Sequence, residues 1–270
     1  MDENSKLQKG LLKGVENAYQ LIVEHLVENE KTTITDTVLV MMTKNIIERV
    51  KTIQILSEMN REESITILTR AFLELQVSLI FILQKNTNER AQSYYYNNKI
   101  QTAKNLISMQ KTNPKYDLTL NKKEIEELKK DIPEANSIQD YIYLYEEKWY
   151  KMFSPYKSKG KKRLYRKWYA LEWEHTSFKD MMRSIGVEEE LYHFFYGITS
   201  IDSHGMGAVK NIKINQDVYK ITGALPSYLC YAVIESYLCN VIFELSDYYG
   251  LTEEEELISA FKMIANSTMV

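Results

Sequence analysis

Three side chains in this sequence have the chemistry to cleave RNA together: Arg70, Glu74 and His204. A histidine exchanges protons near neutral pH, and an arginine binds phosphate through its planar fork. The pair suits attack by an RNA 2′-hydroxyl on its neighbouring phosphate, with His204 as the base and Arg70 stabilising the charged transition state. Glu74 follows Arg70 by four residues and would orient one of the two. We interpret these three residues as candidate catalytic residues.

The same three residues also fit a purely structural role. Arg70 and Glu74 stand in the very apolar stretch 62–85, where an unpaired charge is costly. A buried ion pair would then orient helices, and the dipole of a helix C-terminus would favour His204 ahead of Gly205. The catalytic interpretation requires the end of the helix expected over 188–205 to pack on the Arg70 side of the apolar helix.

A second candidate site is the basic and aromatic stretch from Lys157 to Tyr169. Cations bind phosphates, and aromatic rings stack on nucleic-acid bases. A solvated loop is the alternative, because Gly160 interrupts the stretch. The net charge of −3 argues against a generally basic nucleic-acid binder but allows a local patch. The candidate nucleic-acid-binding residues are Lys161, Lys162, Arg163, Arg166, Lys167 and Trp168.

Composition and periodicity predict an all-α protein. Only 9 glycines and 4 prolines occur among 270 residues, which favours long helices over a sheet with many turns. We expect one helical domain over 1–270, a multi-helix bundle with a charged, partly irregular insertion over 112–170. The stretch 210–220 is interpreted as a polar linker. Three-four apolar spacing predicts helices over about 6–29, 33–60, 62–85, 88–109, 121–128, 137–150, 177–185, 188–205, 226–249 and 252–265.

Several classes of protein and site are not expected. No run of eighteen apolar residues occurs, and the first residues lack the pattern of a signal peptide, so we expect a cytoplasmic protein without membrane contact. Cys230 and Cys239 would lie on opposite sides of one helix and could not pair. No HExxH, Cys-x2-Cys, Walker or G-x-S-x-G motif is present, so we expect neither metal nor cofactor.

A combination of motifs resembles a bacterial helical family of unknown function, marked by an early R-x3-E and a late, tryptophan-led S-x3-H-G. The resemblance covers roughly residues 62–205. The sequence departs from the family pattern at Glu174-His175, where small residues such as Ser-Gly are expected. The matching elements are Arg70-x3-Glu74, Trp173-x3-Ser177, Gly186, Tyr192-x3-Tyr196 and Ser200-x3-His204-Gly205.

A wider similarity is to the helical HEPN group, which includes RNA-cleaving toxins and defence proteins. That group has an arginine and a histidine four to six residues apart. Arg183 and His193 are farther apart here, and Arg70 and His204 belong to different expected helices, so the similarity is an analogy of fold.

Two functional hypotheses follow. The first is a stress or phage-defence protein of the helical toxin type, acting as a metal-independent endoribonuclease. The second is a non-catalytic interaction or ligand-binding module, in which Arg70, Glu74 and His204 form a structural network. RNA, a second copy of the chain and an unidentified protein are the expected partners. The aromatic and methionine content favours the homodimer.

Overall fold

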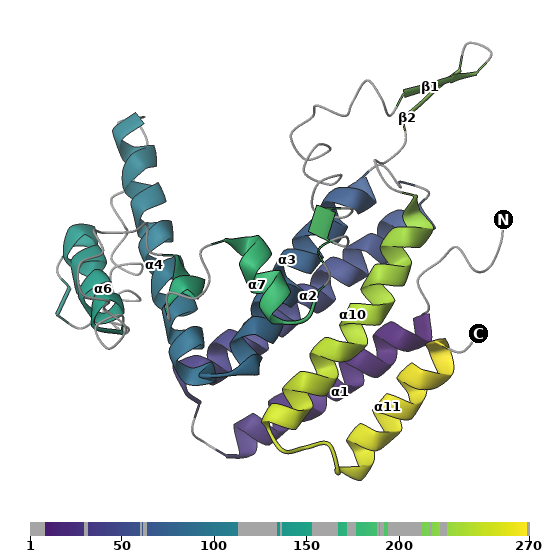
Figure 1. The fold of residues 1–270 in the computed structure, drawn as a ribbon, viewed down its shortest axis with the longest axis horizontal. Coiled ribbons are helices and arrows are strands. Elements are labelled where there is room, and N and C mark those ends of the chain that lie inside the picture. The colour runs from purple at the N-terminus through teal and green to yellow at the C-terminus, as the bar shows by residue number, and fades with distance from the viewer. Residues whose placement is uncertain are drawn as a thin grey trace. The chain divides into compact units, whose positions relative to one another are not determined.

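The structure is a computed structural model of the chain (Figure 1). It describes residues 9–29, 32–59, 61, 64–112, 134–135, 137–152, 167–171, 177–187, 189, 192–193, 212–215, 218–221 and 226–268. Its helices are α1 (Lys9–Glu28), α2 (Ile34–Glu58), α3 (Ile65–Gln84), α4 (Thr87–Thr112), α6 (Ile138–Met152), the 3-10 turn η4 (Trp168–Ala170), α7 (Phe178–Ser184), α10 (Ser227–Tyr248) and α11 (Glu255–Thr268). The all-α fold class is thereby confirmed.

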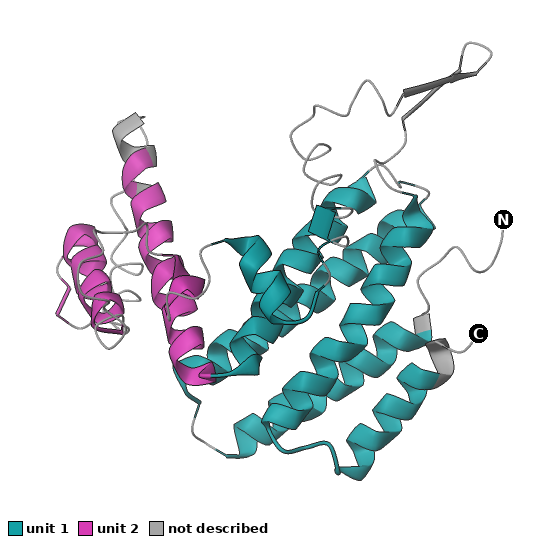
Figure 2. Cartoon of the chain, in the orientation of Figure 1, with its two compact units in different colours: residues 1–85, 177–270 teal, residues 86–176 magenta. Residues whose placement is uncertain are grey.

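The chain divides into two compact units (Figure 2). The first unit consists of residues 1–85 and 177–270, and the second of residues 86–176. The expected insertion at 112–170 falls in the sequence range of the second unit, which also takes in α4. Each unit has its own core of buried apolar side chains, as a stable folding unit requires.

Helices from both ends of the sequence make up the first unit. α1 packs against α11, while α3 packs against both α2 and α10, and the short α7 packs on α3. Their contacts follow from apolar stripes at three-four spacing, which place one side of each helix in the core. The fully buried side chains include Leu11 of α1, Ile46 of α2, Phe72 of α3 and Leu238 of α10.

Local sequence signals set the helix ends. Thr33 and Asp36 form a capping box at the start of α2, and Ser177 and Asp180 form one at the start of α7. The glycine after α7, Gly186, has a φ of +80°, a conformation that favours glycine over other residues.

α1 and α11 approach each other closely at a glycine. A Cβ added to Gly14 would stand 2.7 Å from Cγ1 of Ile264 and 3.2 Å from the carbonyl oxygen of Ala260. Gly14 is buried, and Ile264 is 5% exposed. The missing side chain therefore sets how closely the last helix packs on the first.

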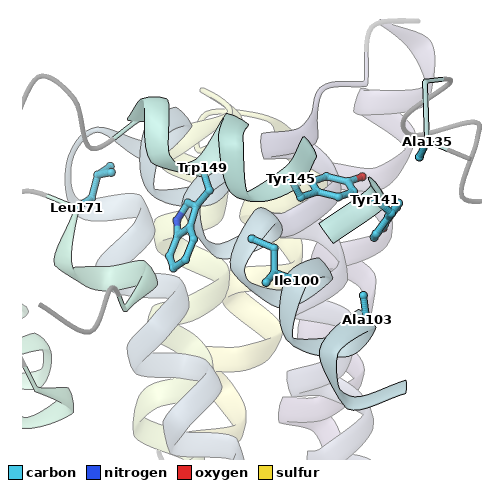
Figure 3. Packing of buried hydrophobic residues seen from close by; sticks show 7 residues of the cluster. All are labelled: Ile100, Ala103, Ala135, Tyr141, Tyr145, Trp149 and Leu171. Carbon is cyan, nitrogen blue, oxygen red and sulfur yellow. The ribbon is translucent and has the colours of Figure 1, made fainter. Parts of the chain in front are cut away.

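In the second unit, α6 and η4 pack on α4. The core of the unit is aromatic, with Tyr141, Tyr145 and Trp149 of α6 buried beside Ile100 and Ala103 of α4 (Figure 3). Tyr95 and Tyr96 of α4 pack against the same cluster, and their rings lie 6.3 Å and 5.6 Å from that of Tyr145. The tyrosine run of α4 thus serves the unit's own packing.

The stretch interpreted as a polar linker contains a β-hairpin instead (Figure 1). Strands β1 (Ile212–Asn215) and β2 (Val218–Ile221) pair antiparallel, with Ile212 opposite Ile221. Both strands are rich in β-branched residues and are separated by two positions, a pattern that predicts a hairpin. The linker interpretation came from the polar residues within the two strands, Lys213, Asn215 and Lys220.

Two helices, α3 and α10, are long and apolar enough to cross a membrane by length and composition alone. In their most apolar windows 67% and 50% of the residues, respectively, are buried inside the protein. The core helix of a soluble protein meets the same test of length and composition. The test alone therefore does not indicate that α3 or α10 crosses a membrane. The absence of membrane contact stays a prediction.

Most expected helices within the described residues are confirmed to within a few positions. The charged helix expected over 121–128 lies outside the described residues, and so does the helix of 188–205 apart from residues 189, 192 and 193.

Candidate functional site

Arg70 and Glu74 form an ion pair on α3. The Nε atom of Arg70 donates a hydrogen bond of 2.9 Å to Oε1 of Glu74, one helical turn further on. The Arg70 side chain is 17% exposed and that of Glu74 is 43% exposed. Glu74 therefore orients the Arg70 guanidinium, as its spacing in the sequence predicts.

α3 is less buried than its composition suggests. Although the sequence of α3 is very apolar, Ile67 is 43% exposed and the Glu74 carboxylate reaches solvent. The physical reason is that α2, α10 and α7 leave this side of α3 partly uncovered. The Arg70–Glu74 pair thus stands at the half-exposed edge of the core and avoids the full cost of burying two charges.

His204, the third candidate catalytic residue, lies outside the described residues. Its meeting with Arg70 therefore stays a prediction. Four of the candidate nucleic-acid-binding residues also lie outside the described residues: Lys161, Lys162, Arg163 and Arg166.

The remaining two candidate nucleic-acid-binding residues, Lys167 and Trp168, are described. Lys167 is exposed, and its Nζ lies 5.5 Å from the ring centroid of Tyr169. Trp168 is half-buried, with its ring 5.0 Å from that of Tyr94 in an edge-to-face arrangement. Its carbonyl oxygen accepts a hydrogen bond of 2.8 Å from Oγ of Ser93. Trp168 therefore anchors the end of the basic stretch to α4.

A cluster that sequence reasoning missed surrounds the carboxylate of Glu189. Lys179 and Arg183 of α7 both pair with Glu189, Arg183 through Nη2 at 2.9 Å from Oε2. Nε2 of His193 lies 3.3 Å from Oε1 of Glu189, and Lys179 stands 5.7 Å from the centroid of the Tyr192 ring. Arg183 and His193, ten residues apart in the sequence, thus contact one carboxylate.

Charge controls the protonation of this cluster. The hydrogen bonds from Lys179, Arg183 and His193 lower the pKa of the Glu189 carboxyl to about 2, because each favours its charged form. Glu189 is thus an anion throughout the physiological pH range. The signals in the sequence were two pairs at four-residue spacing, Lys179 with Arg183 and Glu189 with His193, but only packing brings the pairs together.

Within the described residues, no group of three or more His, Cys, Asp or Glu side chains is placed to hold a metal ion. Cys230 and Cys239 are both free thiols, as expected. Burial is the main cause that raises the pKa of each thiol, which keeps both protonated at neutral pH.

Comparison with protein families identifies the chain's relatives. The model of DUF5677, a family of unknown function, matches residues 36–217, more than half of the 270-residue chain. The chain belongs to this family. The DUF5677 match includes Arg70, Glu74, His204 and the Glu189 cluster, and confirms the expected membership of a family of unknown function. Among curated proteins and among solved structures, no significant match was found.

Proposed function

We propose that this DUF5677 protein is a cytoplasmic, metal-independent endoribonuclease of the helical toxin type, acting in bacterial stress or phage defence. The observation that carries the proposal is the Arg70–Glu74 pair, in which a carboxylate holds an arginine at the half-exposed edge of the core. A guanidinium held in this way suits a phosphate whose charge increases during reaction. The defence role rests on the resemblance to helical toxins.

The proposed reaction is an internal transesterification. His204 takes the proton of the 2′-hydroxyl, whose oxygen forms a bond to the adjacent phosphorus. The bond from phosphorus to the 5′-oxygen breaks, and that oxygen takes a proton from solvent, leaving a 2′,3′-cyclic phosphate. Arg70 stabilises the additional negative charge on the phosphoryl oxygens. The cations of the segment from Lys161 to Lys167 hold the RNA backbone.

The test uses total RNA and a labelled single-stranded RNA in excess EDTA, with wild type, His204→Ala and Arg70→Ala. Loss of the general base should lower the cleavage rate about 100-fold or more. His25→Ala is the matched control, because His25 lies outside the family match. Cleavage with cyclic phosphate ends that survives in His25→Ala and is lost in His204→Ala supports the proposal. Equal cleavage by all variants, or none by wild type, contradicts it.

The second candidate function is a non-catalytic helical module that binds a protein or a ligand. One observation favours it: the Arg70–Glu74 contact is an i,i+4 pair within one helix, a common stabilising arrangement without catalytic purpose. If the protein is such a module, Arg70→Ala changes the melting temperature, and neither the variant nor the wild type cleaves RNA. An ion pair at this spacing on one helix contributes about 0.5 kcal/mol, so a melting shift beyond a few degrees would point to a larger network.

A further inference from the structure

Four ionisable side chains meet beside α7 in the first unit, and the proposed function uses none of them. The carboxylate of Glu189 contacts the other three: Lys179 and His193 at Oε1, and Nη2 of Arg183 at 2.9 Å from Oε2. Nζ of Lys179 also lies 3.4 Å from Nε2 of His193. Nitrogen atoms of three side chains thus converge on the two oxygens of one carboxylate.

These three side chains are of the types that bind phosphate. The planar fork of an arginine pairs with the oxygens of a carboxylate or a phosphate alike, and a lysine binds either as a point charge. A phosphate monoester carries close to two negative charges and three strong acceptor oxygens. The Glu189 carboxylate offers one charge and two oxygens. A phosphoryl group therefore suits the three donors better than the carboxylate that they contact.

The cluster has positive charge and hydrogen-bond donors to spare. Lys179 and Arg183 oppose the single charge of Glu189, and a protonated His193 would add to theirs. Arg183 is 61% exposed and donates one hydrogen bond, through Nη2, to the described residues, although a guanidinium has five N–H groups. Asp180, the one acidic residue of α7, is engaged in the capping box at the start of that helix.

Glu189 can leave these cations at little cost. Its side chain is 46% exposed and that of His193 is 63% exposed. Exposed ion pairs contribute little to stability, because water solvates the separated charges. The low pKa of the Glu189 carboxyl shows that the surrounding donors favour an anion at this place. An anion from solution with a higher charge can therefore take the place of the carboxylate, which then turns into water.

We propose that Lys179, Arg183 and His193 form a binding site for a phosphate monoester, and that the Glu189 carboxylate occupies this site until the ligand displaces it. The inference goes beyond the proposed function, because it requires neither RNA cleavage nor the residues assigned to it. The ligand chemistry is a phosphoryl dianion, either free phosphate or the phosphate group of a nucleotide. A phosphodiester carries a single charge and competes less well with Glu189.

The test is titration calorimetry of the full chain at pH 7 and low ionic strength with inorganic phosphate, uridine 5′-monophosphate and uridine. Glu189→Gln removes the competing charge and should bind phosphate about tenfold more tightly than wild type. In that variant, Lys179→Met or Arg183→Met should each weaken binding about tenfold. Lys13→Met is the matched control, because it removes an exposed cation of α1 and should change nothing.

A second control addresses net charge. Glu188 and Glu190 adjoin Glu189 in the sequence and lie outside the described residues. Glu188→Gln and Glu190→Gln each remove the same charge as Glu189→Gln. If either tightens phosphate binding as much as Glu189→Gln does, net charge alone controls the affinity and the proposed site is wrong.

The remaining outcomes also decide the proposal. It is overturned if Glu189→Gln binds neither phosphate nor the nucleotide, if it binds them no more tightly than wild type, or if Lys13→Met weakens binding as much as Arg183→Met. Equal affinity for phosphate and nucleotide would identify the phosphoryl group as the whole ligand. Tighter binding of the nucleotide, with none of uridine, would identify a nucleotide, and both results support the site.

Circular dichroism checks that each variant stays folded. If Arg183→Met unfolds, Arg183→Lys replaces it, since lysine keeps the charge and loses the planar fork. Phosphate binding by Glu189→Gln should then weaken several-fold, and unchanged affinity would overturn the role of Arg183.

Discussion

The hydroxyl of Tyr249 donates a hydrogen bond of 2.9 Å to Oδ1 of Asp36, joining two residues that are 213 positions apart. Asp36 belongs to the capping box of α2, where its Oδ2 accepts a hydrogen bond of 2.9 Å from the backbone nitrogen of Thr33. One carboxylate therefore fixes the start of α2 and ties it to the residue that follows α10.

Removing this hydroxyl should destabilise the protein. Tyr249→Phe leaves the 9%-exposed Asp36 with one donor fewer, and hydrogen bonds to charged groups contribute about 2 kcal/mol. Urea unfolding followed by circular dichroism should show that loss at pH 7. Tyr228→Phe, an exposed change on α10, is the control and should unfold as wild type does. Equal stability of the two variants would contradict the role of this hydrogen bond.

The same contact predicts a dependence on alkaline pH. Burial and the Asp36 charge raise the pKa of Tyr249 above its usual value. A raised folded-state pKa gives stability that is complete below the unfolded value of about 10 and is lost as pH rises above it. The stability difference between wild type and Tyr249→Phe should therefore narrow from pH 9 to pH 11. A stability difference that stays constant over this pH range would show that Tyr249 has the same pKa in the folded and the unfolded protein.

The glycine between α1 and α11 should not tolerate a large side chain. Gly14→Leu would place atoms where Ile264 already stands, and overpacking of this kind costs about 2 kcal/mol. Thermal unfolding measures the loss. Asn17→Leu on the exposed side of α1 is the control, because it adds the same side chain without the contact. If both variants melt like wild type, the close approach of the two helices is wrong.

The core of the second unit depends on the hydroxyl of Ser93. Ser93→Ala removes the acceptor of the Trp149 indole and the donor to the Trp168 carbonyl. Leaving a buried group without a partner costs about 1–3 kcal/mol. The change should also alter the emission of Trp149. In a double-mutant cycle with Trp149→Phe, the two losses should sum to more than the loss of the double variant, and strict additivity would contradict the contact.

The carboxyl of Glu189 should titrate far below an ordinary glutamate. Its pKa of about 2 comes from Lys179 first, then Arg183 and His193. NMR titration of the side-chain carboxyl should therefore show little protonation at pH 3. In Lys179→Met the midpoint should move up toward the usual value of about 4.3. A normal midpoint in wild type would mean that the cluster is absent in solution. Lys13→Met, an exposed change on α1, is the control.

Much of the fold could be predicted from local sequence. The apolar spacing of α1 and α2, Pro226 ahead of α10 and Gly186 after α7 mark helices that the structure confirms. The Arg70–Glu74 pair could also be predicted, because four-residue spacing places two side chains on one side of a helix. The β-hairpin was missed, although β-branched residues in both strands signal it.

Among the described residues, the sequence by itself determined the helices, their ends to within a few positions, and the inability of Cys230 to pair with Cys239, since each depends on residues a few positions apart. Only the tertiary structure decided the convergence of Lys179, Arg183 and His193 on Glu189, the bond from Tyr249 to Asp36 and the exposure of Arg70 and Glu74. The physical reason is that helical periodicity shows which side of a helix is apolar, whereas the neighbour that covers it depends on how all helices pack together.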